Sequence, residues 1–126
     1  MGQELIKHYL KDNTGELFIT TYEYRENSFL VNLENETHRV ILIFKEHPYY
    51  ILSSLQNFYP YTDYTNIEIQ RTNFYIIRRS KLISCFVSNI EEEAQTFNKI
   101  HFLIYTADIC LDVITDNMPD TIITPL

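Results

Sequence analysis

The chain has 126 residues, of which 45% are hydrophobic and 21% are charged, and it carries a net charge of −7. A chain of this length is expected to form one domain, covering residues 1–126, and to bury roughly two thirds of the surface that it exposes when unfolded. Its two glycines and four prolines exclude a fibrous or low-complexity chain, and no apolar run approaches the roughly 20 residues of a membrane-spanning helix.

The excess negative charge lies in the last third of the sequence. Residues 1–81 contain ten acids and nine bases, whereas residues 82–126 contain seven acids and the single base Lys99. A protein that binds a phosphate backbone clusters Lys and Arg, so direct nucleic-acid binding is disfavoured and a basic partner is favoured. The plainer interpretation is that an acidic surface keeps a small protein soluble.

The N-terminus has no apolar run typical of a secretory signal, so a cytoplasmic location is expected. Cys85 and Cys110 both lie in apolar surroundings, which predicts buried thiols in a reducing compartment and no disulfide.

The chain begins with a predicted short helix over residues 3–11. Its apolar side chains recur at helical spacing, and Gly15 follows where a helix C-cap favours glycine. From Leu17 onward the period changes to two, with four side chains expected on one face of a strand, namely Phe18, Thr20, Tyr22 and Tyr24.

Alternation continues over residues 29–33, and residues 40–44 are apolar on both sides of a predicted strand. Polar turns separate these runs from each other and from residues 17–24. The pattern predicts a three-stranded meander. Pro48 is expected to end its third strand, because proline cannot donate a ladder hydrogen bond, and residues 49–52 can form a further strand.

Residues 53–66 are irregular and rich in aromatic side chains, among them Tyr59, Tyr61 and Tyr64. Exposed tyrosines are enriched at protein interfaces, so these are candidate anchors for a partner, although a lid folded over the sheet explains them equally well. Residues 67–70 alternate as in a strand, and Thr72-Asn73 then has the spacing of a tight hairpin turn that leads into a second strand over residues 74–78.

Ser80 is a candidate N-cap for the strongest helical pattern in the sequence, which runs to about residue 98. The opposite side of this helix is expected to expose Glu91, Glu92 and Glu93. A run of acids is most simply a solvated face, and it can also contact a basic partner.

The densest apolar run covers residues 101–115. Its first half, Phe102–Tyr105, has no polar face, which is typical of a strand in the middle of a packed sheet. Its second half is rich in β-branched residues, which favours a hairpin return, whereas a helix capped by Thr106 remains the alternative. Residues 121–124 can add an edge strand.

Together these elements predict an α+β fold: a mainly antiparallel sheet of six to eight strands with a short N-terminal helix and one longer helix near residues 80–98.

The sequence contains no motif typical of a metal site or a phosphate-binding loop. No pair of histidines has zinc-ligand spacing, and two glycines cannot build a phosphate-binding loop. His101, beside the core strand, is expected to be a satisfied structural histidine. We therefore expect no catalytic residues, no metal and no cofactor, and hence no enzyme.

Four aspartates recur at intervals of four residues. On a continuous helix they would stack like charges, which again favours the hairpin. On strands they are expected to form an acidic rim next to the glutamate triplet. The predicted partner-binding set is therefore Glu91, Glu92, Glu93, Asp108, Asp112, Asp116, Asp120, Tyr59, Tyr61 and Tyr64.

The order of elements also carries a resemblance. An aromatic strand FYIIRRS, a helix opened by SKLISCF, the run HFLIYTADICLDVI and a proline-containing tail follow one another. This order resembles small bacterial immunity proteins encoded beside polymorphic toxins, including those of contact-dependent growth inhibition systems, over about residues 29–120. The resemblance implies binding to a cognate toxin domain, often a basic nuclease, and it assigns no individual residue a role.

A second class fits the same bulk properties. A phage- or plasmid-encoded inhibitor that mimics nucleic acid is also small, acidic and non-enzymatic. Its charges are expected to follow phosphate spacing over one broad face, whereas a toxin-binding surface needs an acidic patch with aromatic anchors.

Overall fold

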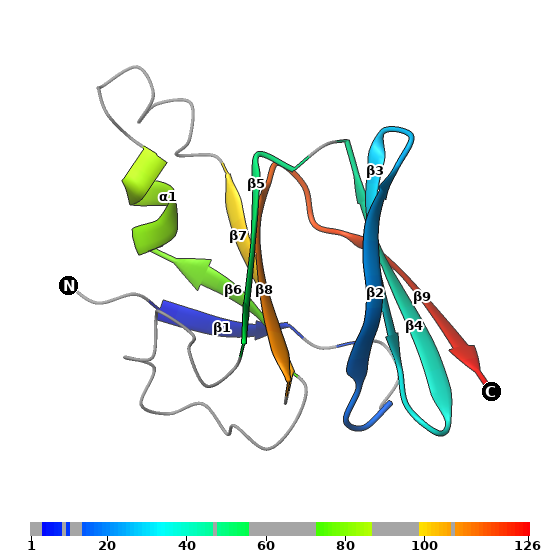
Figure 1. Ribbon diagram of the computed structural model, residues 1–126. Helices are drawn as coiled ribbons and strands as arrows, with labels where there is room; N and C mark the ends of the chain where they lie inside the picture. The colour runs from blue at the N-terminus through cyan, green and yellow to red at the C-terminus, as the bar shows by residue number, and fades with distance from the viewer. Residues whose placement is uncertain are drawn as a thin grey trace.

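Two antiparallel sheets face each other, and one short helix lies on the far side of the larger sheet (Figure 1). The computed structural model describes residues 4–8, 10, 14–46, 48–55, 73–86, 99–106 and 108–126. The five-stranded sheet has the order β1 (Glu4–His8), β6 (Asn73–Arg78), β7 (Ile100–Tyr105), β8 (Ile109–Thr115) and β5 (Tyr50–Leu55). The four-stranded sheet has the order β2 (Phe18–Arg25), β3 (Ser28–Glu34), β4 (His38–Lys45) and β9 (Asp120–Pro125).

The predicted meander is confirmed as β2, β3 and β4, which pair in sequence. Its alternation is clear in β4, where Val40, Leu42 and Phe44 are fully buried while Ile41 and Ile43 are partly exposed on the other face. The sheet therefore has an inner face of buried side chains and an outer face that is partly open to solvent.

The predicted grouping of side chains on β2 is wrong because the strand contains a bulge. The register with β3 shifts between Ile19 and Thr21. An extra residue in one strand inverts the alternation that follows it. Phe18 consequently lies on the outer face, opposite Glu34, whereas Tyr22 lies on the inner face, opposite Val31.

The preferred hairpin over residues 101–115 is confirmed. β7 is the middle strand of the five-stranded sheet and pairs antiparallel with β8. Thr106 holds the turn: its N–H donates to the carbonyl of Ile109 at 3.2 Å, and its hydroxyl oxygen accepts the N–H of Ile109 at 3.1 Å. Thr106 thus caps a turn between two strands. The helix that it was alternatively expected to cap is the strand β8.

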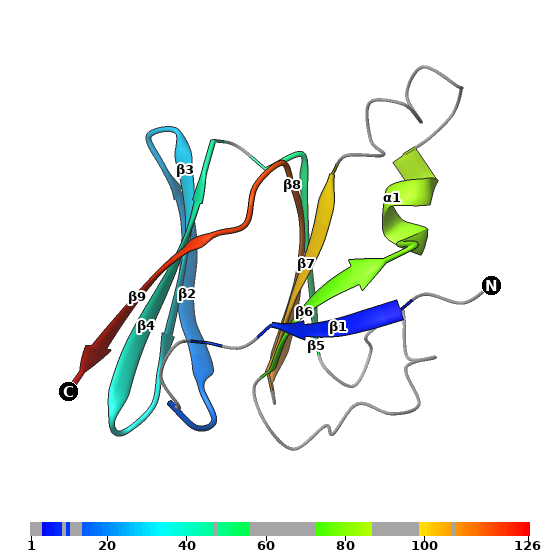
Figure 2. The same ribbon diagram turned by 180° about the vertical axis from the view of Figure 1, so that it is seen from behind.

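The predicted edge strand at the end of the sequence is also confirmed. After β8 the chain crosses to the other sheet and adds β9 beside β4 (Figure 2). The N–H of Leu126 donates to the carbonyl of Thr37 at 2.8 Å. Every second residue of β9, counted back from Leu126, therefore directs its backbone groups toward β4. By that alternation the nitrogen of Pro125 points away from β4, so this proline removes no hydrogen bond from the sheet.

The main core lies between the inner faces of the two sheets. Four phenylalanines cross it in contact with one another: Phe29, Phe44, Phe102 and Phe74. The contact between Phe44 and Phe102 is edge-to-face, with ring centroids 5.6 Å apart, and it joins β4 of one sheet to β7 of the other. Aromatic pairs in this geometry add to the free energy gained by burying their surface.

A second buried cluster covers the opposite face of the five-stranded sheet and consists of Tyr75, Ile77, Leu103, Tyr105 and Cys110. The helix α1 (Lys81–Phe86) lies on this side (Figure 1). Because β7 is covered on both faces, it has no polar side chain on either, apart from His101. This explains why its sequence reads as a continuous apolar run.

The predicted α+β class is wrong, because the described chain is almost entirely antiparallel β structure with one short helix. The predicted N-terminal helix is the strand β1, which pairs with the outer edge of β6. A helix of that length is marginal on its own, since isolated helices need about 12–15 residues, whereas a sheet edge offers backbone partners at once.

The predicted long helix is described only over Lys81–Phe86, and residues 87–98 lie outside the described part of the chain. The first strand of the hairpin predicted before Phe74 also lies outside it, and Asn73 belongs to β6 rather than to a turn. No helix within the described residues is long and apolar enough to cross a membrane.

Replacing Phe102 by alanine should lower the free energy of unfolding by about 3–5 kcal/mol, because the ring is fully buried and contacts Phe44 and Phe74. Phe18→Ala is the matched control. That ring is 41% exposed on the outer face, so its removal should cost less than about 1 kcal/mol. Urea denaturation measures both, and equal losses would contradict the central position of β7.

Candidate functional site

Three polar side chains are buried together on the helix-covered face of the five-stranded sheet. His101 Nδ1 lies 2.6 Å from Ser80 Oγ, and His101 Nε2 lies 2.5 Å from Asp112 Oδ1. His101 and Asp112 are fully buried and Ser80 is 5% exposed. We call these residues the Ser80–His101–Asp112 cluster.

Each member is placed by a different element. Ser80 directly precedes α1 and caps it, since its Oγ accepts the N–H of Ile83 at 3.1 Å, as expected for an N-cap. His101 and Asp112 lie on neighbouring strands, where Ile114 is the direct partner of His101 and Asp112 is one step along the same face. The hairpin therefore brings the histidine and the carboxylate together, and the cap of α1 completes the cluster.

One arrangement of protons satisfies all these contacts. In the neutral tautomer of His101 that carries its proton on Nε2, Ile83 N–H donates to Ser80 Oγ, Ser80 O–H donates to His101 Nδ1, and His101 Nε2–H donates to Asp112 Oδ1. A continuous chain of donors and acceptors makes a buried polar group tolerable in an otherwise apolar layer.

A serine, a histidine and an aspartate are also the residues of the catalytic triad of many hydrolases. A nucleophile has to reach a substrate, and Ser80 is almost completely covered. Its oxygen is also engaged by the N–H of Ile83, as the cap of a helix. The arrangement suits a structural role, in which the cluster fixes the start of α1 against the sheet.

Cys110 lies on the same face and is a free, fully buried thiol. Burial raises the pKa of this thiol to about 12, and the nearby charge of Asp112 adds to the effect, while a backbone hydrogen bond at Thr106 opposes it. A thiol with so high a pKa is a poor nucleophile, because the thiolate is the reactive form. Cys110 is therefore a buried thiol, as predicted.

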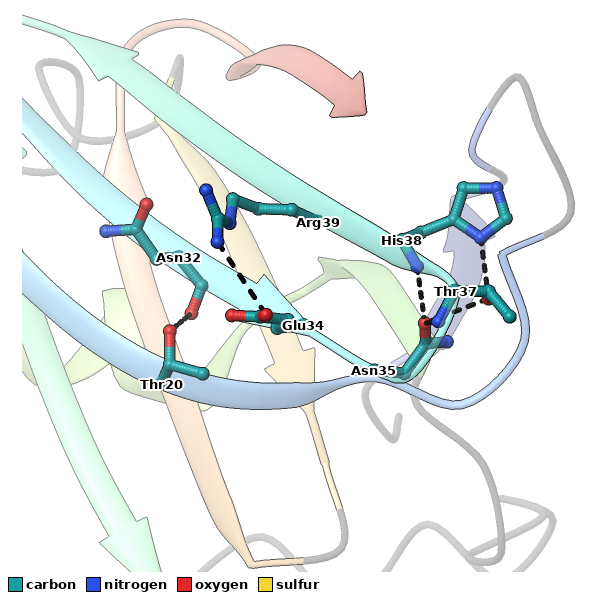
Figure 3. A network of polar contacts seen from close by, with 7 residues as sticks. All are labelled: Thr20, Asn32, Glu34, Asn35, Thr37, His38 and Arg39. Carbon is teal, nitrogen blue, oxygen red and sulfur yellow. Dashed lines mark hydrogen bonds and ion pairs between the residues drawn. The ribbon is translucent and has the colours of Figure 1, made fainter. Parts of the chain in front are cut away.

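The turn between β3 and β4 contains a second polar network, centred on Asn35 (Figure 3). Its Oδ1 accepts the backbone N–H groups of Thr37 and His38 at 2.9 and 2.8 Å. Its Nδ2 donates to the carbonyls of Thr14 and Glu16 at 2.7 and 2.9 Å. One side chain thus ties the turn to the segment that leads into β2.

A shallow depression of about 490 Å³ lies at this turn and is lined by Phe18, Asn35, Glu36 and Thr37. Asn35 is fully engaged in the turn, and Glu36 has no second titratable group beside it in that lining.

Large exposed aromatic side chains gather on β2 and at the start of β5. Tyr22 and Tyr24 are 41% and 53% exposed although they lie on the inner face of β2, because β2 is the edge of its sheet. The hydroxyl of Tyr22 donates to Ser53 Oγ on β5 at 3.2 Å, which brings the two edge strands together. Tyr49 and Tyr50 are exposed where β5 begins. We call Tyr22, Tyr24, Tyr49 and Tyr50 the tyrosine edge.

The four aspartates predicted as an acidic rim are not brought together. Asp108 is exposed in the β7–β8 turn, while Asp116 follows the opposite end of β8, a strand roughly 20 Å long. Asp112 is buried in the polar cluster and is unavailable to a partner. Asp120 begins β9, on the other sheet.

Two of these aspartates are held by lysines. Lys99 binds Asp116 and also lies 4.1 Å from the centroid of the Tyr49 ring. The hydrogen bond to Asp116 raises the pKa of Lys99. Lys45 binds Asp120 at 2.9 Å, and this hydrogen bond raises the pKa of Lys45. Both aspartates therefore sit beside a compensating positive charge.

The other predicted contacts, Glu91, Glu92, Glu93, Tyr59, Tyr61 and Tyr64, lie outside the described residues. The tyrosine edge was missed by the sequence analysis. Tyr22 and Tyr24 were assigned to a regular strand face, and exposure at a sheet edge depends on which strands are neighbours. The Tyr49-Tyr50 pair directly after Pro48 was the available signal.

No group of three or more His, Cys, Asp or Glu side chains within the described ranges could hold a metal ion. Comparisons with protein-family models, with curated proteins and with solved structures found no match.

Ser80→Ala should lower the free energy of unfolding by about 2–3 kcal/mol. Loss of the cap accounts for about 1 kcal/mol, and a buried histidine nitrogen left without its partner adds about 1–2 kcal/mol. Ser84→Ala is the matched control, since Ser84 is exposed and its hydroxyl bonds the backbone of the same turn. A loss at Ser80 no larger than at Ser84 would contradict the proposed anchoring of α1.

Cys110 should resist alkylation in the folded protein, because burial and its raised pKa keep it protonated. In a Cys85→Ser background, labelling by iodoacetamide should stay slow as the pH passes the ordinary thiol value of 9.0. Urea should make it fast, since the unfolded thiol ionises near its ordinary pKa. Fast native labelling that rises with a midpoint near the ordinary value would refute this assignment. Mass spectrometry measures both rates.

Proposed function

We propose that the protein is an immunity protein of the bacterial cytoplasm that binds and neutralises a cognate toxin domain. The partner is a basic, nuclease-type toxin, and no cofactor takes part. The observation that supports this best is the tyrosine edge: an acidic protein exposes Tyr22 and Tyr24 on β2, at the edge of one sheet, and Tyr49 and Tyr50 at the start of β5, at the edge of the other. Tyrosines supply large contact area at low entropy cost and are enriched at binding hot spots.

The packing beneath the tyrosine edge supports its use in binding. The rings of Tyr22 and Tyr24 contact Phe29, with centroids 6.1 and 5.2 Å apart, and Phe29 belongs to the ring series that crosses the core. Tyr22 is further held by its hydrogen bond to Ser53. Side chains that are already fixed lose little conformational entropy when a partner binds.

The net charge of −7 supports a cationic partner. An acidic protein attracts a basic one over roughly a Debye length, so the association rate should fall as salt is added, while the buried aromatic contacts should control dissociation. Glu91–Glu93, Tyr59, Tyr61 and Tyr64 remain predicted contacts of the same partner.

The alternative, an inhibitor that mimics nucleic acid, has less support on the described surface. On the outer face of the four-stranded sheet the acids alternate with bases, as in Glu23 with Arg25 and Glu34 with Arg39. A surface that imitates a phosphate backbone requires a series of uncompensated negative charges.

The direct test is co-expression with the toxin encoded beside this protein. Cells that carry both should survive, and the purified proteins should form a complex whose association slows with salt. If cells die as fast with this protein as without it, the immunity assignment is wrong.

Tyr22→Ala and Tyr24→Ala test the surface. Each should weaken toxin binding by about 2 kcal/mol or more if the ring is a hot spot. Phe18→Ala is the matched control, since Phe18 and Tyr22 are equally exposed, at 41%, on opposite faces of β2. Calorimetry measures affinity, and an unchanged melting temperature checks the fold. If all three variants bind alike and protect cells, immunity stands and this choice of surface is wrong.

A further inference from the structure

The outer edge of β9 presents backbone groups to solvent. Because Leu126 N–H bonds the carbonyl of Thr37, every second residue back from Leu126 directs its N–H and C=O toward β4. Thr121 and Ile123 are the alternate residues, so their backbone groups point outward. No described strand pairs with this edge.

β9 lacks the features that keep the opposite edge of the same sheet unpaired. β2 contains a bulge and carries Glu23 and Arg25 near its end, and both features discourage a further strand. β9 has no bulge in its register with β4, and Thr121–Thr124 is an uncharged run of β-branched residues. Ile122 is 47% exposed on the outer face.

We propose that two copies of this chain pair through β9, antiparallel, about a two-fold axis at Ile122. Thr121 and the partner's Ile123 then exchange both backbone hydrogen bonds, and Ile123 and the partner's Thr121 do the same. The four-stranded sheet becomes continuous across the two copies. The two Ile122 side chains meet on the outer face, each beside its own Ile41.

Self-complementarity argues for a second copy. An antiparallel edge can pair with a second copy of itself about a two-fold axis, and here that pairing places the exposed apolar side chain of Ile122 against Ile122 of the partner subunit. The register follows from Pro125. An axis at Ile123 would place Thr121 opposite a proline that has no N–H to donate, whereas an axis at Ile122 satisfies both outward residues.

The local charge permits this contact although the chain as a whole is acidic. β4 and β9 together carry two cations, Arg39 and Lys45, and one anion, Asp120. Lys45 and Asp120 already form an ion pair. Two copies therefore approach through an edge that is not acidic. The tyrosine edge includes β2, at the opposite edge of the sheet, and stays open.

Cysteine cross-linking tests the register. Residues at the axis form a non-hydrogen-bonded pair with Cα atoms about 4.5 Å apart, within the range of about 4.4–6.8 Å that a disulfide spans. Ile122→Cys should give a disulfide-linked dimer under mild oxidation. Thr124→Cys should not, because the two Thr124 residues lie more than about 10 Å apart along the strands. The unmodified protein, which has its own two cysteines, is the background control.

Proline substitution tests the hydrogen bonds. Thr121→Pro removes an N–H that points away from β4, so the fold should remain, as circular dichroism will show, while the dimer dissociation constant rises by about tenfold or more. Thr121→Val keeps the N–H and should dimerise like the natural protein. Sedimentation velocity over a concentration series measures both.

A monomer at every concentration, together with no cross-link at Ile122→Cys, would overturn the proposal. So would equal cross-linking at both cysteine positions, which indicates random collision, or equal dimerisation of Thr121→Pro and Thr121→Val. If Thr121→Pro fails to fold, the two cysteine variants decide the question alone. None of these results depends on toxin binding.

Discussion

The edge-to-face contact between Phe44 and Phe102 is the interaction on which the arrangement of this molecule depends. It joins β4, the last strand of the meander, to β7, the middle strand of the other sheet, and both rings are fully buried. Each ring continues into its own sheet, Phe44 toward Phe29 and Phe102 toward Phe74. Because Phe29 also contacts Tyr22 and Tyr24, the core determines where the exposed tyrosines stand. A loss of packing at the centre should therefore disturb the proposed binding edge.

Sequence patterns predicted the strands of this core well. A strand that is buried on one face alternates apolar and polar residues, and a strand that is buried on both faces is apolar throughout. The alternation of β3 and the continuous apolar run of β7 are examples. The failures arose where a partner elsewhere in the chain decides the structure. Glu4–His8 fits helical spacing, yet it becomes a strand because β6 offers an edge. The bulge near Thr20 leaves no hydrophobic signal, and it moves Phe18 to the other face.

The candidate site was harder to predict for a related reason. The four-residue spacing of the aspartates suggested a shared surface, but each sits in a different structural setting, and spacing says nothing about those settings. His101 was expected to be a satisfied histidine, and it is. That its partners are Ser80 and Asp112 could not be read from the sequence. They are 21 and 11 residues away, and only the hairpin register and the position of α1 bring them together. The tyrosine edge depends on strand order, which hydrophobic period does not encode.

The two faces of the five-stranded sheet stabilise the fold by different means. The inner face is apolar, and apolar packing tolerates many combinations of side chains as long as volume is kept. The other face contains a polar chain from Ile83 through Ser80 and His101 to Asp112, whose donors and acceptors fit one position of α1. Hydrogen-bond geometry is more selective than apolar contact, so this face can specify where the helix begins. The Ser80–His101–Asp112 cluster thus suits a structural role, and the two partner surfaces that we propose on the described part of the chain are sheet edges: the tyrosine edge, which includes β2, and β9 on the opposite side of the same sheet. Because these edges are separated by the width of that sheet, occupation of one leaves the other accessible, and a dimer joined through β9 would display two tyrosine edges facing away from its axis.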